Sequence, residues 1–303
     1  MKSARLYLLA FVFLLVFIFS FMWLSNKGVF SPTESPYELA INFSDYWNSG
    51  EAEITSYELE QARYGEIRKG NAVLIYVTEP FNTEQQVKAE SASSRKDQVL
   101  KLNMTRNFLT GIYPYSIMSS TFFPLEEKQH AIKVSASVQE WCGQIYSQLN
   151  NRGVYEILTH SYFEGEADRY RELEPVKLEN EIWTIIRLDP NKLPQGSFNM
   201  LPALEYMELM HLEPVAYKAQ AVLRKRKGQY TYALTYPSLN RELAITFDTE
   251  FPYVIHSWKD TYLSGGENPV MLESSAKKIK RIKTAYWERN KKNDTYLYHS
   301  LGL

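Results

Sequence analysis

The chain has 303 residues, of which 45% are hydrophobic and 14% aromatic, so it can bury a large core and is not a disordered polymer. Its 34 basic and 35 acidic residues leave a formal net charge of -1, which excludes a long-range attraction for nucleic acid. Cys142 is the single cysteine, which excludes both an intrachain disulfide and a two-cysteine redox centre.

An uninterrupted apolar stretch, LYLLAFVFLLVFIFSFMWL, occupies residues 6–24. As a helix it would reach about 28–30 Å, which matches the hydrocarbon core of a bilayer, its expected partner. Bulky side chains stand where a signal peptidase needs small ones, so the stretch predicts a retained transmembrane anchor. Lys2 and Arg5 precede it, and basic residues stay on the cytoplasmic side. We therefore expect a cytoplasmic amino terminus, with the remaining chain beyond the membrane.

The sequence divides into three parts. Residues 1–27 form the expected cytoplasmic tip and transmembrane anchor, and residues 28–36 form a linker that contains Pro32 and Pro36. Residues 37–303 form one β-rich domain. No internal repeat of fixed period occurs in it.

The third part begins with a short predicted helix, which Gly50 ends. The stretch 71–79 is apolar on both faces, which is typical of a central strand. Residues 82–98 are polar and lack periodicity, so we expect a loop there. In AIKVSASVQ, residues 131–139, apolar residues recur at every second position, which predicts a strand with one buried face. The other strand patterns of this half occupy residues 53–64, 99–105, 111–123 and 154–163.

The second half contains the best later helix pattern, KLENEIWTIIR at residues 177–187, which Asp189 and Pro190 end. Consecutive strand patterns with short turns follow, and they imply antiparallel pairing. They occupy residues 205–212, 216–223, 230–236, 242–248 and 253–263. We therefore predict a mainly β (α+β) fold: a large antiparallel sheet, curved or forming a half-barrel, with a few short helices, preceded by one transmembrane helix.

Cys142 stands in Trp-Cys-Gly, which also begins the redox motif of thioredoxins. A thiol hydrolase needs a histidine base, and a turn at residues 150–153 can bring His160 within reach. Free cysteines are among the most often buried residues, so the favoured interpretation is a small apolar packing group. The alternative keeps Cys142 as a nucleophile and His160 as its base.

A second group of candidates combines charged and aromatic residues. Glu60 belongs to the strand expected at residues 53–64, and Arg63 and Tyr64 approach a turn at Gly65. Such residues form either a ligand-binding rim or an ordinary solvent face with cross-strand ion pairs, and the second is favoured. The candidate ligand-binding residues are Glu60, Arg63, Tyr64, Glu140, Trp141 and Gln144.

No metal or cofactor is predicted. The five histidines lack zinc spacing, and no phosphate-binding loop, dinucleotide fingerprint or GxSxG elbow occurs. Glu164, Glu166 and Asp168 alternate as calcium ligands can, but the calcium-loop pattern is absent, so a solvated loop is expected. The basic stretch KKIKRIK at residues 277–283 predicts a charged edge strand, and its alternative is a contact with anionic lipid or cell-wall polymer.

From about Tyr46 onward the chain resembles a family of uncharacterised Bacteroidota proteins. The matching stretches are ELEQARYGEI, GIYPYSIMSSTFFP, VQEWCGQIYSQLNN, SYFEGEAD, TEFPYVIHSW and the ending SLGL. The resemblance implies a Gram-negative envelope, and hence an inner-membrane protein whose main domain lies in the periplasm. Some members carry the name septum formation inhibitor Maf, which implies nucleotide pyrophosphatase activity. The Ser-Pro-Arg-Arg motif of Maf proteins does not occur, because no arginine follows Ser31-Pro32 or Ser35-Pro36.

These features favour a membrane-anchored periplasmic protein that binds an envelope lipid, a glycan or a partner protein, or maintains the envelope, without catalysing a reaction. A curved antiparallel sheet can enclose an apolar ligand. One alternative is a hydrolase that uses Cys142 or a carboxylate. The other is a nucleotide pyrophosphatase of the Maf type.

Overall fold

The computed structural model describes residues 39–90, 96–125 and 130–303. These residues belong to one compact unit. The predicted anchor at residues 6–24 and the predicted linker at residues 28–36 lie outside the described residues. Within the described ranges, no helix is long and apolar enough to cross a membrane.

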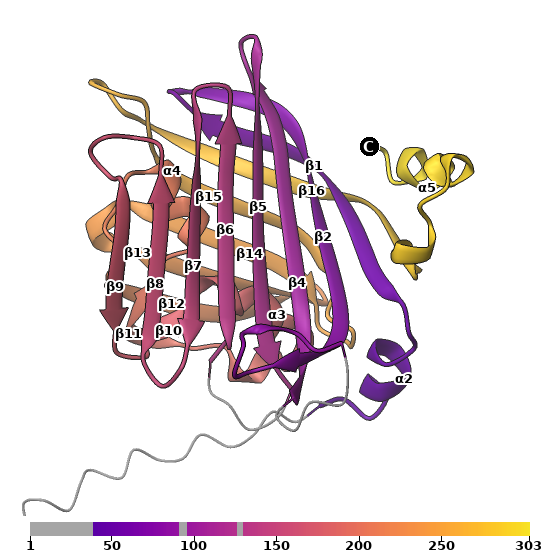
Figure 1. Cartoon of the computed structure of the whole chain (residues 1–303). Coiled ribbons are helices and arrows are strands. Elements are labelled where there is room, and N and C mark those ends of the chain that lie inside the picture. The colour runs from indigo at the N-terminus through magenta and orange to yellow at the C-terminus, as the bar shows by residue number, and fades with distance from the viewer. Residues whose placement is uncertain (1–38, 91–95, 126–129) are drawn as a thin grey trace, which may run out of the picture. The chain divides into compact units, whose positions relative to one another are not determined.

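The described residues form one open 16-stranded sheet (Figure 1). Its pairs are antiparallel except for a short parallel pair, β10 with β11. The prediction of a mainly β fold with a large antiparallel sheet and few helices is confirmed. The strands are β1 (Ala52–Arg63), β2 (Glu66–Asn82), β3 (Val87–Lys88), β4 (Lys96–Thr110), β5 (Tyr113–Pro124), β6 (Lys133–Glu140), β7 (Gly143–Asn151), β8 (Tyr155–Ser161), β9 (Asp168–Leu173), β10 (Lys177–Leu178), β11 (Gly196–Leu201), β12 (Tyr217–Arg226), β13 (Gln229–Tyr236), β14 (Arg241–Asp248), β15 (Ile255–Ser264) and β16 (Val270–Thr284).

The chain enters the sheet in its middle, at β1. It then runs outward through β2 and β4, strand by strand, to one edge at β9, and the short β3 pairs with β2. From there it passes to the opposite edge at β10 and returns to β16, which pairs with β1. Strands β9 and β10 do not pair with each other in the described part of the chain, so the sheet stays open.

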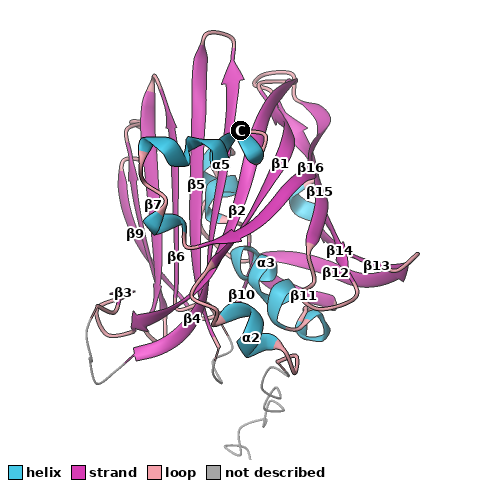
Figure 2. Ribbon diagram, turned by 90° about the vertical axis from the view of Figure 1, so that its right-hand side faces the viewer, coloured by secondary structure: helices cyan, strands magenta, loops and turns pink. Residues whose placement is uncertain are grey.

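Two short helices, α3 (Glu179–Leu188) and α4 (Leu204–Leu209), pack against one face of the sheet, and Figure 2 shows the first of them, α3, inside the curve of the strands. Every residue of both helices is buried. The helix predicted at residues 177–187 is thus confirmed as α3. The other helical segments are α2 (Phe43–Trp47), α5 (Thr295–Ser300), η1 (Pro190–Lys192), η2 (Pro237–Leu239), η3 (Tyr286–Glu288) and η4 (Lys292–Asp294).

The strands orient their side chains as the sequence periodicity predicts. In β6, Val134, Ala136 and Val138 are buried, and the residues between them are not. In β1, Glu58 and Glu60 are exposed and their neighbours are buried. Period-two alternation therefore identified both the strands and their inward faces.

The strand predicted for residues 205–212 is wrong, because this segment forms α4 and the turn after it. All six residues of α4 are buried, including Glu205 and Glu208, whose spacing of three residues fits a helix and not a strand. At the start of α4, the backbone N–H of Leu204 donates to Asn180 Oδ1 of α3 at 3.1 Å. That contact joins segments far apart in the sequence, and a local pattern cannot reveal it.

The charged edge predicted for residues 277–283 is confirmed for most of the stretch. These residues belong to the end of β16, which from Lys278 onward pairs with β1 on one side only, because the pairing with β15 stops at Lys277. Next to them, the carboxy-terminal Leu301 packs against Ile54 of β1 in a small cluster that Ile282 of β16 joins. The basic stretch therefore lies at a local edge of the sheet, and many of its side chains are exposed.

A buried ion pair joins α3 to the sheet. Arg187 of α3 donates to both carboxylate oxygens of Glu53 in β1, at 2.7 and 2.8 Å. The two side chains are 2% and 0% exposed. Arg187 also donates from Nε to the carbonyl oxygen of Pro252 at 2.7 Å. Its guanidinium lies 5.0 Å from the ring centroid of Trp47 and 4.6 Å from that of Tyr76, so it is enclosed on every side.

The pair determines how Glu53 titrates. Burial opposes the ionisation of Glu53, but the charge and hydrogen bonds of Arg187 outweigh burial and hold the pKa of Glu53 below its usual range. The Tyr46 hydroxyl donates a further hydrogen bond to the same carboxylate. A carboxyl whose pKa falls on folding stabilises the fold above its unfolded pKa of about 4.3, and this stabilisation is lost as the pH falls through the folded pKa. The pair is therefore fully formed at neutral pH and weakens in acid.

Replacement of Glu53 by glutamine (Glu53→Gln) leaves Arg187 buried without its anion. We expect the free energy of unfolding at pH 7 to fall by about 3–5 kcal/mol. The matched control is Glu58→Gln on the exposed face of the same strand, which should change that free energy by less than about 0.5 kcal/mol. Urea unfolding of the full chain, followed by tryptophan fluorescence, measures both variants. Equal stability of the two would contradict the role assigned to the pair.

Candidate functional site

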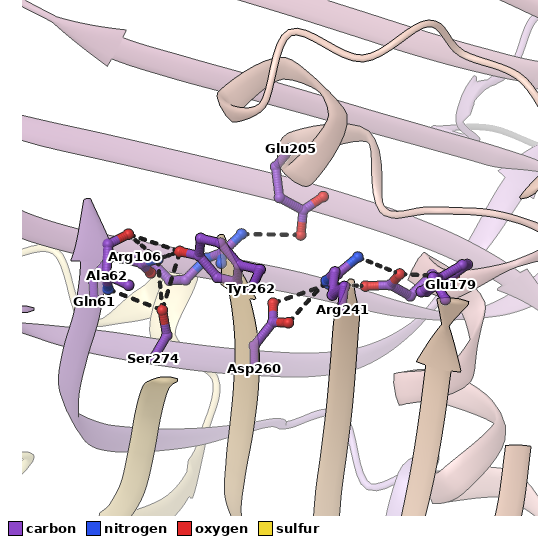
Figure 3. Close-up of polar contacts among 10 residues, drawn as sticks. Gln61, Ala62, Arg106, Glu179, Glu205, Arg241, Asp260, Tyr262 and Ser274 are labelled. Carbon is purple, nitrogen blue, oxygen red and sulfur yellow. Dashed lines mark hydrogen bonds and ion pairs between the residues drawn. The ribbon is translucent and has the colours of Figure 1, made fainter. Parts of the chain in front are cut away.

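A buried polar cluster lies between the helices and the sheet (Figure 3). Arg241 of β14 donates to Glu179 of α3 at 2.7 and 2.8 Å and to Asp260 of β15 at 2.8 and 3.0 Å. Arg106 of β4 lies 3.2 Å from Glu205 of α4. The cavity beside these groups has a volume of about 30 Å³, which is the volume of about one water molecule. Each carboxylate faces an arginine and there is no room for a ligand, so this cluster is structural.

Two openings lie at one end of the sheet, which we call the rim, and a wider, shallower opening of about 550 Å³ lies over β11–β14. Antiparallel hairpins place alternate turns at the same end, and Figure 1 shows these turns at the top. The carboxy-terminal end of α4 reaches the same place, because its last residues line the openings described next. The rim turns and loops are residues 64–65, 111–112, 141–142, 162–167 and 265–269.

Two adjoining cavities open at the rim. The first has a volume of about 250 Å³ and the second of about 260 Å³. The residues that line both cavities are Arg63, Tyr64, Leu209 and His211. Further lining of the first cavity is mainly aromatic and apolar, with Tyr206, Met210 and Tyr262. The second cavity adds carboxylates, with Glu140 and Glu208, beside the aromatic rings of Tyr115 and Phe163.

Arg63 is a permanent cation at the junction of the two cavities. Its Nη1 donates to the carbonyl oxygen of Leu209 at 2.7 Å, and its Nη2 donates to the hydroxyl of Tyr115 at 3.1 Å. The guanidinium lies 4.4 Å from the ring centroid of Tyr64. Among the described residues, no carboxylate pairs with Arg63 and its Nε has no hydrogen-bond partner. This guanidinium therefore remains able to bind an anion.

Exposed apolar side chains occupy the same turns. Ile112 is 82% exposed, Tyr162 is 75% exposed and Trp141 is 69% exposed. Tyr162 lies over Gly143, where a larger residue would collide with its ring, and Gly143 lines the second cavity. Apolar side chains left in water beside a cavity are typical of a binding surface.

The structure brings part of the predicted site together. Four of the candidate residues line the second cavity: Arg63, Tyr64, Glu140 and Cys142. Trp141 lies in the same turn as Cys142, and its ring centroid is 6.5 Å from that of Tyr113. Glu60 and Gln144 do not join the site, because both are exposed on the outer face of the sheet.

Cys142 is exposed, so its interpretation as a buried packing group is wrong. Its backbone N–H donates to Glu140 Oε2 at 2.7 Å. A hydrogen bond to Glu140 and the negative charge of that carboxylate raise the pKa of the Cys142 thiol. This environment disfavours the thiolate that a nucleophile needs. His160 does not approach Cys142, because it lies on the outer face of β8 with its Nδ1 3.0 Å from Asp168 Oδ1.

The sequence did not identify Glu208, Leu209 and His211 as site residues, because the pattern of that segment predicts a strand. His211 has a positive φ of 54°, which reverses the chain directly after α4. Its Nδ1 pairs with Glu166 of the loop at residues 162–167. Nothing in the local sequence links these residues, since only the tertiary fold brings α4 to the rim.

The described ranges contain no group of three or more histidine, cysteine, aspartate or glutamate side chains placed to hold a metal ion. The carboxylates considered for calcium bind other partners. Glu166 accepts a hydrogen bond from the Ser161 hydroxyl at 2.8 Å, and Asp168 pairs with His160. The loop at residues 162–167 is thus connected by hydrogen bonds to its own protein neighbours.

Comparison of the chain with protein-family models, with curated proteins and with solved structures gives no match. The rim is therefore interpreted from its own chemistry: one cation without a carboxylate partner, two carboxylates that line the second cavity, and an aromatic and apolar surround.

The variant Glu140→Gln removes the charge that raises the pKa of Cys142. We expect a larger thiolate fraction at pH 7 and severalfold faster alkylation by iodoacetamide. Mass spectrometry of the full chain measures the rate. The control is Glu164→Gln, which removes an exposed carboxylate from the loop at residues 162–167 and should leave the rate unchanged. If Glu140→Gln does not accelerate alkylation, Glu140 is not the cause.

Proposed function

We propose that the protein is a membrane-anchored envelope protein that binds an amphipathic anion at the rim without converting it. The observation that carries this proposal is Arg63, a cation without a carboxylate partner in the described part, at the junction of two cavities. A phosphate or a carboxylate is the group that matches the donors of a guanidinium. The apolar lining of the first cavity suits the apolar part of the same ligand.

The filled interior of the sheet supports the rim as the binding site. Helices α3 and α4 pack against the inner face of β4–β7, where a curved sheet would otherwise hold a ligand. The cavities beside them have volumes of about 30 and 20 Å³, against about 250 and 260 Å³ at the rim. A ligand larger than water therefore fits at the rim and not beneath the helices.

The proposal assigns the domain to the periplasm of a Gram-negative cell. Its support is the apolar stretch at residues 6–24, the basic residues Lys2 and Arg5 before it, and the resemblance to Bacteroidota proteins. In that compartment, membrane lipids and cell-wall glycans are molecules in which an acidic group is attached to a large acyl or sugar portion. The bilayer itself is the proposed partner of residues 6–24.

A thiol hydrolase is the second candidate, because Cys142 and His211 line the same cavity and Glu166 pairs with His211. A histidine that a carboxylate orients is the base that such an enzyme needs. The raised pKa of the Cys142 thiol weighs against this candidate. Binding without conversion is therefore the function that the geometry supports best.

Replacement of Arg63 by methionine should weaken the binding of octyl methyl phosphate by about tenfold to a hundredfold, since a hydrogen-bonded charge is lost. This probe has one negative charge and a short apolar chain. Isothermal titration calorimetry on the full chain in amphipol measures its affinity, and 1-octanol, which lacks the charge, corrects for apolar partition. Arg63→Lys keeps a cation and should retain part of the affinity.

The matched control is Arg68→Met. Arg68 lies on the same hairpin as Arg63, but it pairs with Glu66 and does not line either rim cavity. This variant should bind the probe as the unmodified chain does. If Arg63→Met and Arg68→Met bind equally well, the rim does not recognise the anion.

A further inference from the structure

Glu208 is a buried carboxyl group without a paired cation among the described residues. It belongs to the last turn of α4, is 7% exposed and lines the second rim cavity together with Arg63. Neither of its carboxylate oxygens has a hydrogen-bond partner among the described residues. The nearby Ser147 hydroxyl, which lines a cavity of about 20 Å³ on the other side of Glu208, is bonded to Thr159 Oγ1 at 2.9 Å. A buried carboxyl group without hydrogen bonds destabilises the fold, unless a ligand supplies them.

The charges around Glu208 favour a cation. Burial raises the pKa of Glu208 to about 8; the Ser147 hydroxyl opposes this rise, and the negative charges of Glu205 and Glu166 add to it. Arg169, the cation that lines the small cavity beside Glu208, is already paired with Glu213 at 3.1 Å. The charged and titratable groups that face Glu208 are Glu205 of α4, Glu166 of the loop, Arg169 of β9, and Arg63, Glu140, Cys142 and His211 across the second cavity.

We propose that the second rim cavity binds an ammonium group at Glu208, so that the ligand is an amphipathic zwitterion whose acid group meets Arg63 and whose amine meets Glu208. This inference rests on the proposed function and narrows its ligand class. An ammonium group carries three N–H donors, which is what two carboxylate oxygens without donors accept. The described residues offer no set of three ligands for a metal ion, so an organic cation fits this cavity better.

Binding of an ammonium group at Glu208 requires that Glu208 lose its proton. Below about pH 8 the carboxyl group of Glu208 is mostly protonated before the ligand binds. An ammonium group pairs with the carboxylate, so binding transfers the proton of Glu208 to solvent. Affinity should therefore rise about tenfold per pH unit between pH 6 and pH 8 and then level off. A ligand acceptor that takes a hydrogen bond from protonated Glu208 would give the opposite trend.

The test compares two phosphodiesters with constant charge in this pH range: octylphosphoethanolamine, which carries an amine, and octyl methyl phosphate, which does not. Calorimetry on the full chain in amphipol should show tighter binding of octylphosphoethanolamine, with the stated pH dependence. Glu208→Gln should abolish both the preference and the pH dependence and should leave the binding of octyl methyl phosphate unchanged. The control Glu164→Gln, at an exposed carboxylate of the rim outside both cavities, should preserve both.

The outcomes separate this inference from the proposed function. Equal binding of the two probes, or affinity that falls from pH 6 to pH 8, overturns the ammonium site and leaves recognition by Arg63 intact. If neither probe binds, both proposals fail.

A second arm with the dipeptide leucyl-phenylalanine identifies the source of the zwitterion. If the dipeptide binds, octylphosphoethanolamine does not, and Glu208→Gln loses the dipeptide binding, the ammonium group belongs to a peptide. If octylphosphoethanolamine binds, the ammonium group belongs to a lipid headgroup.

Discussion

The buried pair between Arg187 and Glu53 fixes what this fold can do. A long antiparallel sheet that bends leaves a concave face, and in this protein α3 occupies it. Arg187 attaches the helix to β1, the strand at which the two halves of the sheet meet. A second arginine, Arg241, attaches the other end of α3 through Glu179. Buried charges tolerate little displacement, because an unpaired charge in the core is strongly destabilising.

The position of the candidate site follows from this packing. Since side chains and helices fill the interior, the two cavities that combine Arg63 with an aromatic and apolar lining lie at the end of the sheet, where turns meet and packing is incomplete. The two places differ in whether their charged groups are paired. Beneath the helices, Glu179 and Asp260 share an arginine, whereas at the rim Arg63 and Glu208 have no charged partner among the described residues. A free guanidinium beside a carboxyl group that ionises when it meets an amine is suited to a ligand that carries both charges.

The sequence predicts much of this fold, because most strands have one buried face and α3 has clear boundaries. It fails where burial is complete or where a partner is distant. The segment at residues 205–212 is short and mostly apolar, so α4 was predicted as a strand, and with it Glu208 and His211 were missed as site residues. Arg63 and Tyr64 were identified because they stand at a strand end beside a glycine turn. Cys142 is exposed because it stands in a turn at the rim. The general tendency of free cysteines to be buried gave the wrong prediction, because it takes no account of that turn.

The central claim is that α3 closes the interior and that a ligand binds at the rim. The most direct measurement is a crystal structure of the chain with octylphosphoethanolamine bound. The account predicts ligand density in the rim cavities, with the phosphate beside Arg63 and with α3 still paired to Glu53. Density between α3 and the sheet, with the helix displaced, would contradict it.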